Sequence, residues 1–246
     1  MEYDFAIIYF GLTRTLKATC ESHKKYIFDI LKKYNLNYKV FLHTWEMKNG
    51  IQNIWEKDIT EKIDSFDYKL VSPDVHRIDD EDEFLKGIHM DSYFYKDVWE
   101  QKGDSEDGEW IPKLVSNYIC MLESQKRGFT MVMDEIKKGN TFKFILFIRP
   151  DIEIFQMLPI DLIINNTNTI QVPNHSHYSG INDQFAIMNY EYACIYSRRI
   201  DELADFRKKE GRIVAEKYCA YIINKYKMDI QIIPFDYTIL RPISFS

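Results

Sequence analysis

Two short, almost entirely apolar runs near the N-terminus constrain the fold of this chain most strongly. Residues 4–10 (DFAIIYF) and 38–43 (YKVFLH) are each typical of a strand that is buried on both faces. The segment between them, residues 16–34, follows a turn at Gly11 and carries apolar residues at helical spacing. A strand, a glycine turn, a helix and a second strand form a βαβ unit with parallel strands, so the sequence predicts a layered α/β fold.

The rest of the chain continues the α/β pattern without an internal repeat or a linker. We therefore predict one domain over residues 1–246, with a mostly parallel central sheet flanked by helices. The run FKFILFI at 142–148 is the most hydrophobic strand and is expected near the sheet centre. The acidic stretch 77–108 is expected to be a solvated loop, with a lid over a cleft as the alternative. Further helices are predicted at 53–64, 110–138, 190–206 and 210–225, and further strands at 68–71, 169–172, 185–188, 229–233 and 237–240.

Composition and charge exclude several classes of protein. Of the 246 residues, 46% are hydrophobic and 28% are charged, which excludes a disordered chain. The formal net charge of −6 gives no general basic surface, so no nucleic-acid partner is expected. The four cysteines lie far apart, which argues against a zinc site and a disulfide framework. No signal-peptide pattern opens the sequence and no apolar run could span a bilayer, so we expect a soluble, cytoplasmic protein.

Three predicted strands end in polar residues, at 11–14, 43–45 and 149–151, and ligands of an open parallel sheet bind beyond such strand ends. The turn at 11–14 (GLTR) places a glycine, a hydroxyl and Arg14 beside a helix N-terminus, where they could receive phosphate oxygens. Its other interpretation is an ordinary turn in which Thr13 or Thr15 caps the helix. Arg149-Pro150-Asp151 follows the most hydrophobic strand, where a fixed carboxylate could ligate a divalent cation together with diphosphate oxygens. The alternative here is an Arg–Asp surface pair at a turn.

A third polar group is the loop 173–184, which ends in Asn182-Asp183-Gln184 before an apolar segment. Asp183 has the chemistry of a general base toward an acceptor hydroxyl. An Asx turn or a helix cap is the structural alternative. His175 and His177 are possible metal ligands in the same loop, although two loop histidines are more often simply exposed.

Taken in order, these segments resemble small nucleotide-sugar glycosyltransferases with a GT-A-type fold, of the sort found in bacteria and large DNA viruses. The resemblance covers most of the chain. It rests on the strand and GLTR turn at 5–14, the strand ending HTW at 43–45, NYICMLESQKR at 117–127, FIRPD at 147–151, NDQFAI at 182–187, and an arginine at 241 near the C-terminus.

The resemblance implies transfer of a sugar from a nucleoside diphosphate-sugar, with UDP favoured, to a hydroxyl of a glycan or glycoconjugate acceptor. Residues 1–150 would form the nucleotide-binding half of a Rossmann-like GT-A domain and 151–246 the acceptor-side half. Asp183 would be the catalytic base if the enzyme inverts. The residues implied to hold the donor are Phe10, Gly11, Thr13, Arg14, Ser124, Arg127, Arg149, Asp151 and Arg241.

The implied metal site departs from the family pattern. Asp151 would replace the metal-binding Asp of a DxD motif and hold Mn²⁺ or Mg²⁺, but Arg149 stands where the first Asp would be. A metal-free site, in which Arg14 and Arg149 neutralise the diphosphate, remains the alternative. Two other functions also remain open: a sulfotransferase-like enzyme that uses the turn at 11–17, and a non-catalytic carbohydrate- or nucleotide-binding module. The turn is neither a Walker loop nor GxGxxG, which weakens the first of these.

Overall fold

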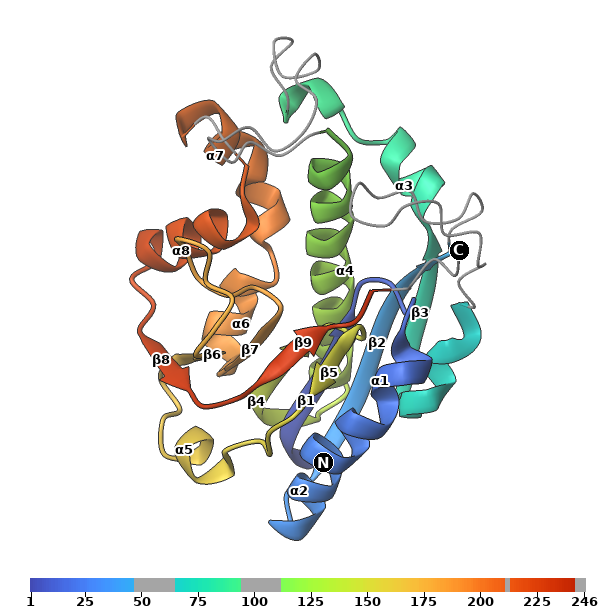
Figure 1. Ribbon diagram of the computed structural model, residues 1–246, viewed down its shortest axis with the longest axis vertical. Helices are drawn as coiled ribbons and strands as arrows, with labels where there is room; N and C mark the ends of the chain where they lie inside the picture. The colour runs from blue at the N-terminus through green and yellow to red at the C-terminus, as the bar shows by residue number, and fades with distance from the viewer. Residues whose placement is uncertain (47–64, 94–111, 211–212, 242–246) are drawn as a thin grey trace.

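The computed structural model describes residues 1–46, 65–93, 112–210 and 213–241 (Figure 1). The helix predicted at 53–64 lies outside them. In chain order the elements are β1 (Glu2–Phe10), α1 (Leu16–His23), η1 (Lys24–Phe28), α2 (Asp29–Lys33), β2 (Tyr38–Glu46), η2 (Ser65–Val71), β3 (Val75–Asp80), α3 (Glu81–Lys86), η3 (Met90–Ser92), α4 (Pro112–Lys137), β4 (Thr141–Ile148), β5 (Ile152–Ile154), α5 (Ile160–Ile164), β6 (Ile170–Pro173), β7 (Phe185–Met188), α6 (Tyr190–Tyr196), η5 (Arg199–Glu202), α7 (Leu203–Glu210), α8 (Ala215–Lys225), β8 (Ile230–Ile233) and β9 (Tyr237–Ile239).

Seven of the described strands form one mixed, mostly parallel sheet in the order β3-β2-β1-β4-β7-β6-β8. β7 runs antiparallel to β4 and β6, and the other neighbouring pairs are parallel. β4 is the middle strand, as its hydrophobic sequence predicted. Helices flank the sheet on both sides (Figure 1). The predicted α/β class with a mostly parallel sheet is therefore confirmed.

Side chains of β1 alternate between two hydrophobic cores, one on each face of the sheet. Phe5, Ile7 and Tyr9 pack with residues of α1, α2 and β5. Ala6 and Ile8 pack with residues of α4, α6 and α8. None of these five side chains has exposed surface. Burial on both faces explains why this strand is apolar at every position rather than at alternate ones.

A second, two-stranded sheet joins the end of the chain to the end of β4. β5 pairs antiparallel with β9, with Ile152 opposite Ile239. Just beyond this pair, the N–H of Leu240 donates to the carbonyl oxygen of Asp151 at 2.8 Å. The C-terminal segment is thereby held beside the Arg-Pro-Asp sequence that follows the central strand.

Three predicted elements differ from the structure. Residues 68–71 belong to the 3₁₀ turn η2, not to a strand, and the buried Tyr68 and Val71 are spaced as in such a turn. The predicted loop at 77–108 is wrong where described: β3 and α3 occupy its first part, and 94–108 lies outside the described residues. β3 looked like a loop because it is an edge strand with mostly polar side chains. The helix predicted at 190–206 is divided into α6, η5 and α7.

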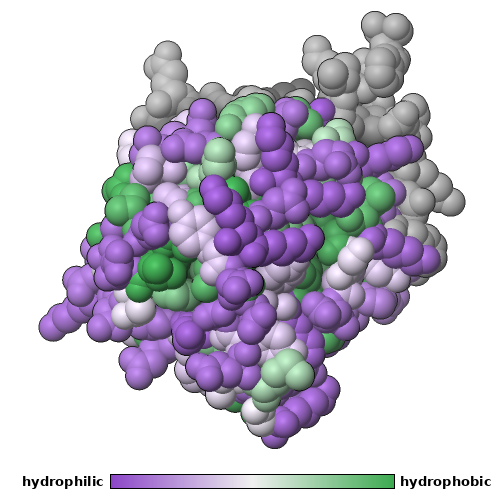
Figure 2. Space-filling view, turned by 90° about the horizontal axis from the view of Figure 1, so that it is seen from below, coloured by the Kyte–Doolittle hydropathy of each residue, from purple (hydrophilic) through white to green (hydrophobic). Residues whose placement is uncertain are grey.

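The lower end of the molecule in Figure 1, near the start of β1, is seen face-on in Figure 2. Hydrophilic side chains cover most of this end, and apolar ones show in small separate areas. Among the described helices, none combines the length and the apolar character that crossing a bilayer requires. The polar clusters described below lie at the opposite end of β1.

Gly128 allows α4 to pack closely on β1. A Cβ added there would lie 2.5 Å from Cγ2 of Ile8, which is a branched methyl on a buried strand. We expect Gly128→Val to lower the free energy of unfolding by about 1–3 kcal/mol, since overpacking outweighs the small gain in helix propensity. Thr130→Val, at an exposed position of the same helix, is the control. Equal denaturant midpoints for both variants would contradict this packing.

Candidate functional site

Three segments meet at the edge of the sheet where β1 and β4 end. The two strands are parallel, with Tyr9 opposite Ile148. β7 is antiparallel to β4 and begins opposite Ile148, so the residues just before β7 lie at the same edge. The N–H of Arg149 donates to the carbonyl oxygen of Gln184 at 3.2 Å. The GLTR turn and the Arg-Pro-Asp segment are therefore neighbours, as expected for the ends of parallel strands, and the antiparallel β7 adds the Asn-Asp-Gln segment to them.

Asp151 accepts hydrogen bonds from two arginines. Nε and Nη2 of Arg14 donate to Oδ2 at 3.1 and 2.7 Å. Nε of Arg149 donates to Oδ1 at 2.8 Å and its Nη2 to Oδ2 at 2.5 Å. The carboxylate is almost fully buried, whereas 21% of the Arg149 side chain stays exposed. Among these three side chains, two positive charges face one negative charge.

The backbone around Asp151 is held from two sides. Thr19 Oγ1 donates to the carbonyl oxygen of Pro150 at 2.6 Å, and Leu240 N–H donates to that of Asp151. Burial alone would raise the pKa of Asp151, but the guanidinium groups of Arg149 and Arg14 outweigh it and hold the pKa well below its usual range. Asp151 is thus a permanently ionised anchor for both arginines. It is not the exposed surface pair considered as the alternative.

The turn after β1 needs its glycine for backbone conformation. Gly11 has φ +93°, which a residue with a side chain rarely adopts, and apart from its chain neighbours no described residue places a heavy atom within 4 Å of the position that a Cβ would take. Phe10 and Thr13 have no exposed surface, and Phe10 packs edge-on against Phe147 in the core. Phe10 and Thr13, which the resemblance placed at the donor, therefore support the turn from within the protein. Arg14 extends from the turn to Asp151.

Two further expectations about this turn concern Thr15 as a helix cap and Arg241 at the donor. Thr15 occupies the N-cap position of α1 but makes no side-chain capping bond. Its Oγ1 instead donates to the carbonyl oxygen of Leu240 at 3.0 Å. Arg241 follows Leu240 directly and is exposed, so its backbone lies next to the Arg14–Asp151 pair.

Asp183 is a buried carboxylate beside this cluster. The Asx turn considered as an alternative is made by Asn182, whose Oδ1 accepts from Gln184 N–H at 2.9 Å. Asp183 is 3% exposed, and its Oδ2 has no hydrogen-bond partner among the described residues. Burial raises the pKa of Asp183, and the charges of Arg199 and Arg149 lower it in part.

Two charged residues that no sequence pattern marked, Arg199 and Glu216, interact electrostatically with Asp183. Arg199 in η5 is fully buried against the Tyr196 ring at 3.8 Å, and its Nη2 donates to Gln125 Oε1 at 2.8 Å. Glu216 in α8 lies under the turn before Asp183: its carbonyl oxygen accepts from Ile181 N–H at 2.9 Å. Both residues lie in segments whose patterns indicated only helix, and no motif marks them.

The two loop histidines hold the loop rather than face outward together. His177 Nδ1 accepts from Asn182 N–H at 3.2 Å, and the His175 ring packs edge-on against Tyr237 at 4.5 Å. The Tyr237 hydroxyl hydrogen-bonds the side chain of Asn182 at 2.7 Å. These contacts fix the segment that carries Asp183.

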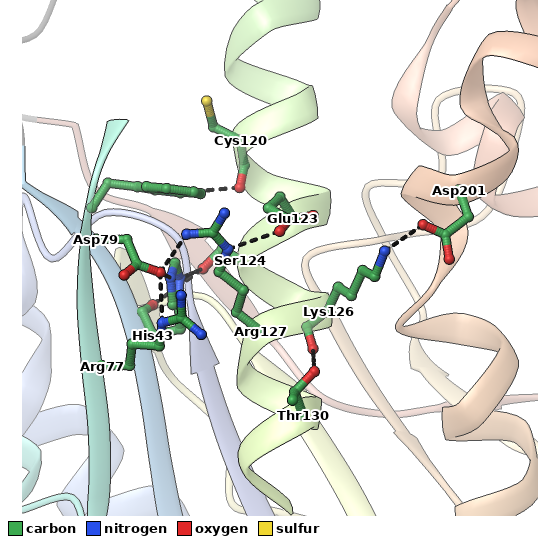
Figure 3. A network of polar contacts seen from close by, with 11 residues as sticks. His43, Arg77, Asp79, Cys120, Glu123, Ser124, Lys126, Arg127, Thr130 and Asp201 are labelled. Carbon is green, nitrogen blue, oxygen red and sulfur yellow. Dashed lines mark hydrogen bonds and ion pairs between the residues drawn. The ribbon is translucent and has the colours of Figure 1, made fainter. Parts of the chain in front are cut away.

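Ser124 and Arg127 belong to a polar network at the ends of β1, β2 and β3 (Figure 3). Ser124 Oγ accepts from Gly11 N–H at 2.7 Å and lies 2.7 Å from His43 Nδ1. His43 Nε2 lies 3.1 Å from Asp79 Oδ2, to which Arg127 also donates. Ser124 has no exposed surface and already accepts a backbone hydrogen bond, so this Ser–His–Asp order is not a nucleophile site.

The donor set at Asp151 does not fit a divalent cation. Both of its oxygens accept from guanidinium groups, so a cation there would face two positive charges at close range. Over the described ranges, no three His, Cys, Asp or Glu side chains gather in a way that could hold a metal ion. We therefore derive no step through Mn²⁺ or Mg²⁺.

Comparisons of the sequence with models of known protein families and with curated proteins find no match.

Glu216 makes the stability of the fold depend on pH. Burial, and then the charge of Asp183, raise the pKa of Glu216 from 4.5 to about 7. A raised pKa in the folded state stabilises the fold fully below pH 4.5, and this contribution is lost as pH rises to about 7. We expect Glu216→Gln to weaken the fall in unfolding free energy across this interval, a fall whose slope is at most about 1.4 kcal/mol per pH unit for one proton. Urea titrations at several pH values measure it. An unchanged slope would show that Glu216 ionises normally.

Proposed function

We propose that this protein is a glycosyltransferase that moves a sugar from a nucleoside diphosphate-sugar to an acceptor hydroxyl. The observation that carries the proposal is the Arg14–Asp151–Arg149 cluster at the turn after β1, with the buried carboxylate of Asp183 acting electrostatically on Arg149. The proposal assigns the domain to the GT-A type and takes UDP as the first donor to test, both on the resemblance stated above.

The arginine cluster supplies what a departing diphosphate needs. When the bond between the sugar and the phosphate breaks, negative charge develops on the diphosphate and must be stabilised. The two guanidinium groups share one carboxylate, so their orientation is fixed before the donor arrives. Planar guanidinium groups match phosphate oxygens well. Under this proposal Arg14 and Arg149 do the work that a cation does in a DxD site, while a cation at Asp151 stays a prediction of the resemblance alone.

Asp183 suits the acceptor side of the same reaction. The acceptor oxygen forms a bond to the anomeric carbon, the carbon–phosphate-oxygen bond breaks with its electron pair on the diphosphate, and the hydroxyl proton passes to Asp183. A carboxylate whose pKa burial has raised is a stronger base than an exposed one. Asp183 and Asp151 both act electrostatically on Arg149, so the proposed base and the proposed diphosphate site are neighbours.

Of the two alternatives, the sulfotransferase-like enzyme has less support. A phosphate cradle at the turn would need backbone N–H groups that point toward the ligand, but the Gly11 N–H donates to Ser124. The non-catalytic module would keep nucleotide binding without turnover. A panel of UDP-, GDP- and dTDP-sugars, assayed for slow hydrolysis without an acceptor, separates the enzyme from the module. A lack of hydrolysis together with clear nucleotide binding would favour the module.

Arg149 gives the first prediction of this function. UDP should raise the melting temperature of the wild-type protein in EDTA, because a ligand that binds only the folded state stabilises it. Arg149→Met should lose this shift, since the diphosphate loses a charged partner. Arg198→Met is the control, because Arg198 is a surface arginine paired with Asp201. A shift that appears only with Mn²⁺ would show that a cation at Asp151 binds the diphosphate. No shift with any nucleoside diphosphate would contradict the proposal.

Asp183 gives the second prediction. Asp183→Asn should slow donor turnover by about 10²–10⁴-fold, the usual contribution of a general base, and leave the dissociation constant of UDP nearly unchanged. Wild-type turnover should fall as pH drops through the raised pKa of Asp183, because the base must be ionised. Initial rates and equilibrium binding on the same samples measure both quantities. Full activity in the variant would remove Asp183 from the mechanism.

A further inference from the structure

A chain of hydrogen-bonded side chains connects the Gly11 turn to β3. Ser124 on α4 accepts from the Gly11 N–H, His43 on β2 contacts Ser124, and Asp79 on β3 contacts His43. Ser124 and His43 have no exposed surface, Gly11 belongs to the turn itself, and 21% of the Asp79 side chain is exposed. Figure 3 shows Ser124 reaching from α4 toward His43, with Asp79 on the far side of the imidazole.

The hydrogen bonds of this chain have one consistent direction. Burial lowers the pKa of His43 to about 4, so its ring is neutral and carries a single proton. Asp79 is a carboxylate that only accepts, which assigns that proton to Nε2 and leaves Nδ1 as an acceptor. The Ser124 hydroxyl then donates to Nδ1 at 2.7 Å, with the His43 carbonyl oxygen as a second, more distant acceptor at 3.1 Å, and its own oxygen accepts the Gly11 N–H. Each donor points from the turn toward Asp79.

Asp79 is itself held in place as an ion. Arg77 Nε lies 2.7 Å from its Oδ2, and Arg127 donates to the same oxygen. Burial alone would raise the pKa of Asp79, but the hydrogen bonds from Arg77, Arg127 and His43 lower it to about 2. Arg127 is oriented in turn by Glu123 at 2.8 Å and by the Trp45 ring, 4.8 Å from its guanidinium carbon. The far end of the chain therefore has a fixed charge and a fixed position.

We propose that Asp79 is a positioning residue that sets the orientation of the Gly11 turn through His43 and Ser124, so that the turn can receive the diphosphate of the donor. This inference rests on the proposed function. It gives new roles to Ser124 and Arg127, which the resemblance placed at the donor: both act through the turn rather than on the ligand. The Gly11 N–H serves the turn itself, and the arginines contact the phosphates.

Asp79→Asn tests the coupling between Asp79 and the turn with little change in shape. The amide oxygen keeps the place of Oδ2, because Arg77 and Arg127 both donate there, so His43 Nε2 donates to a neutral acceptor instead of a carboxylate. Ring ¹⁵N shifts should therefore show a protonated Nε2 in both proteins, with the Nε2 signal moved in the variant because its hydrogen bond is weaker. The backbone amide signal of Gly11 should move as well, which a purely structural loss elsewhere would not cause.

Donor binding provides the functional readout. We expect Asp79→Asn to weaken UDP binding by about fivefold, the equivalent of one ordinary net hydrogen bond, with a smaller change in the turnover number. Ser124→Ala should weaken UDP binding to a similar extent, because it removes the link to Gly11. Asp201→Asn is the control: Asp201 pairs with Lys126 on the same helix α4 at 2.5 Å but has no bond to the chain (Figure 3).

The outcomes separate this inference from the proposed function. An unchanged Gly11 amide and an unchanged His43 ring in folded Asp79→Asn would overturn the inference even if UDP binds well. If the wild type binds no nucleoside diphosphate, the proposed function is wrong, and so is the part of the inference that concerns donor binding. The ¹⁵N data would then still decide whether Asp79 controls the turn. Equal effects of Asp79→Asn and Asp201→Asn on UDP binding would also overturn it.

Discussion

Asp151 organises the edge of the sheet because two arginines from different segments share its carboxylate. Arg14 comes from the turn after β1 and Arg149 from the end of β4, so their positions relative to each other are set by one buried anion. Removing the negative charge of Asp151 would leave two guanidinium groups facing each other, which is costly. The backbone around Asp151 is also held in place, because Leu240 N–H donates to the carbonyl oxygen of Asp151 and Thr19 Oγ1 to that of Pro150.

The strand order brings the other residues of the site to the same edge of the sheet. The central position of β4 fixes where Arg149 emerges, and the antiparallel β7 brings Asp183 back to the same edge. The small β5–β9 sheet returns the C-terminal segment to Asp151. On the other side of the Gly11 turn, the Ser124–His43–Asp79 chain ties the turn to β2 and β3. The turn is thus held from both sides.

Much of the fold could be predicted because burial on both faces leaves a strong pattern. β1, β2 and β4 are apolar at nearly every buried position, and their predicted central or parallel placement is confirmed. β3 could not be predicted because an edge strand buries too little to need an apolar sequence. The meeting of Arg14 and Asp151 follows from the rule that parallel strands end at one edge, whereas Asp183 joins them because β7 runs antiparallel to β4. Arg199, Glu216 and the His43–Asp79 contact could not be predicted, since they depend on how separate helices and strands pack. No comparison tests the resemblance to glycosyltransferases, so that part of the account stays a proposal.

The central claim is that fixed arginines, and not a cation, hold the second phosphate of a donor. Dissociation constants of UDP and UMP, measured by calorimetry in EDTA, test this claim most directly. Because hydrogen bonds to charged groups contribute about 1.5–3 kcal/mol each, the account predicts that UDP binds at least about tenfold more tightly than UMP without metal. Equal affinities in EDTA, with a preference for UDP that appears only on adding Mn²⁺, would contradict it.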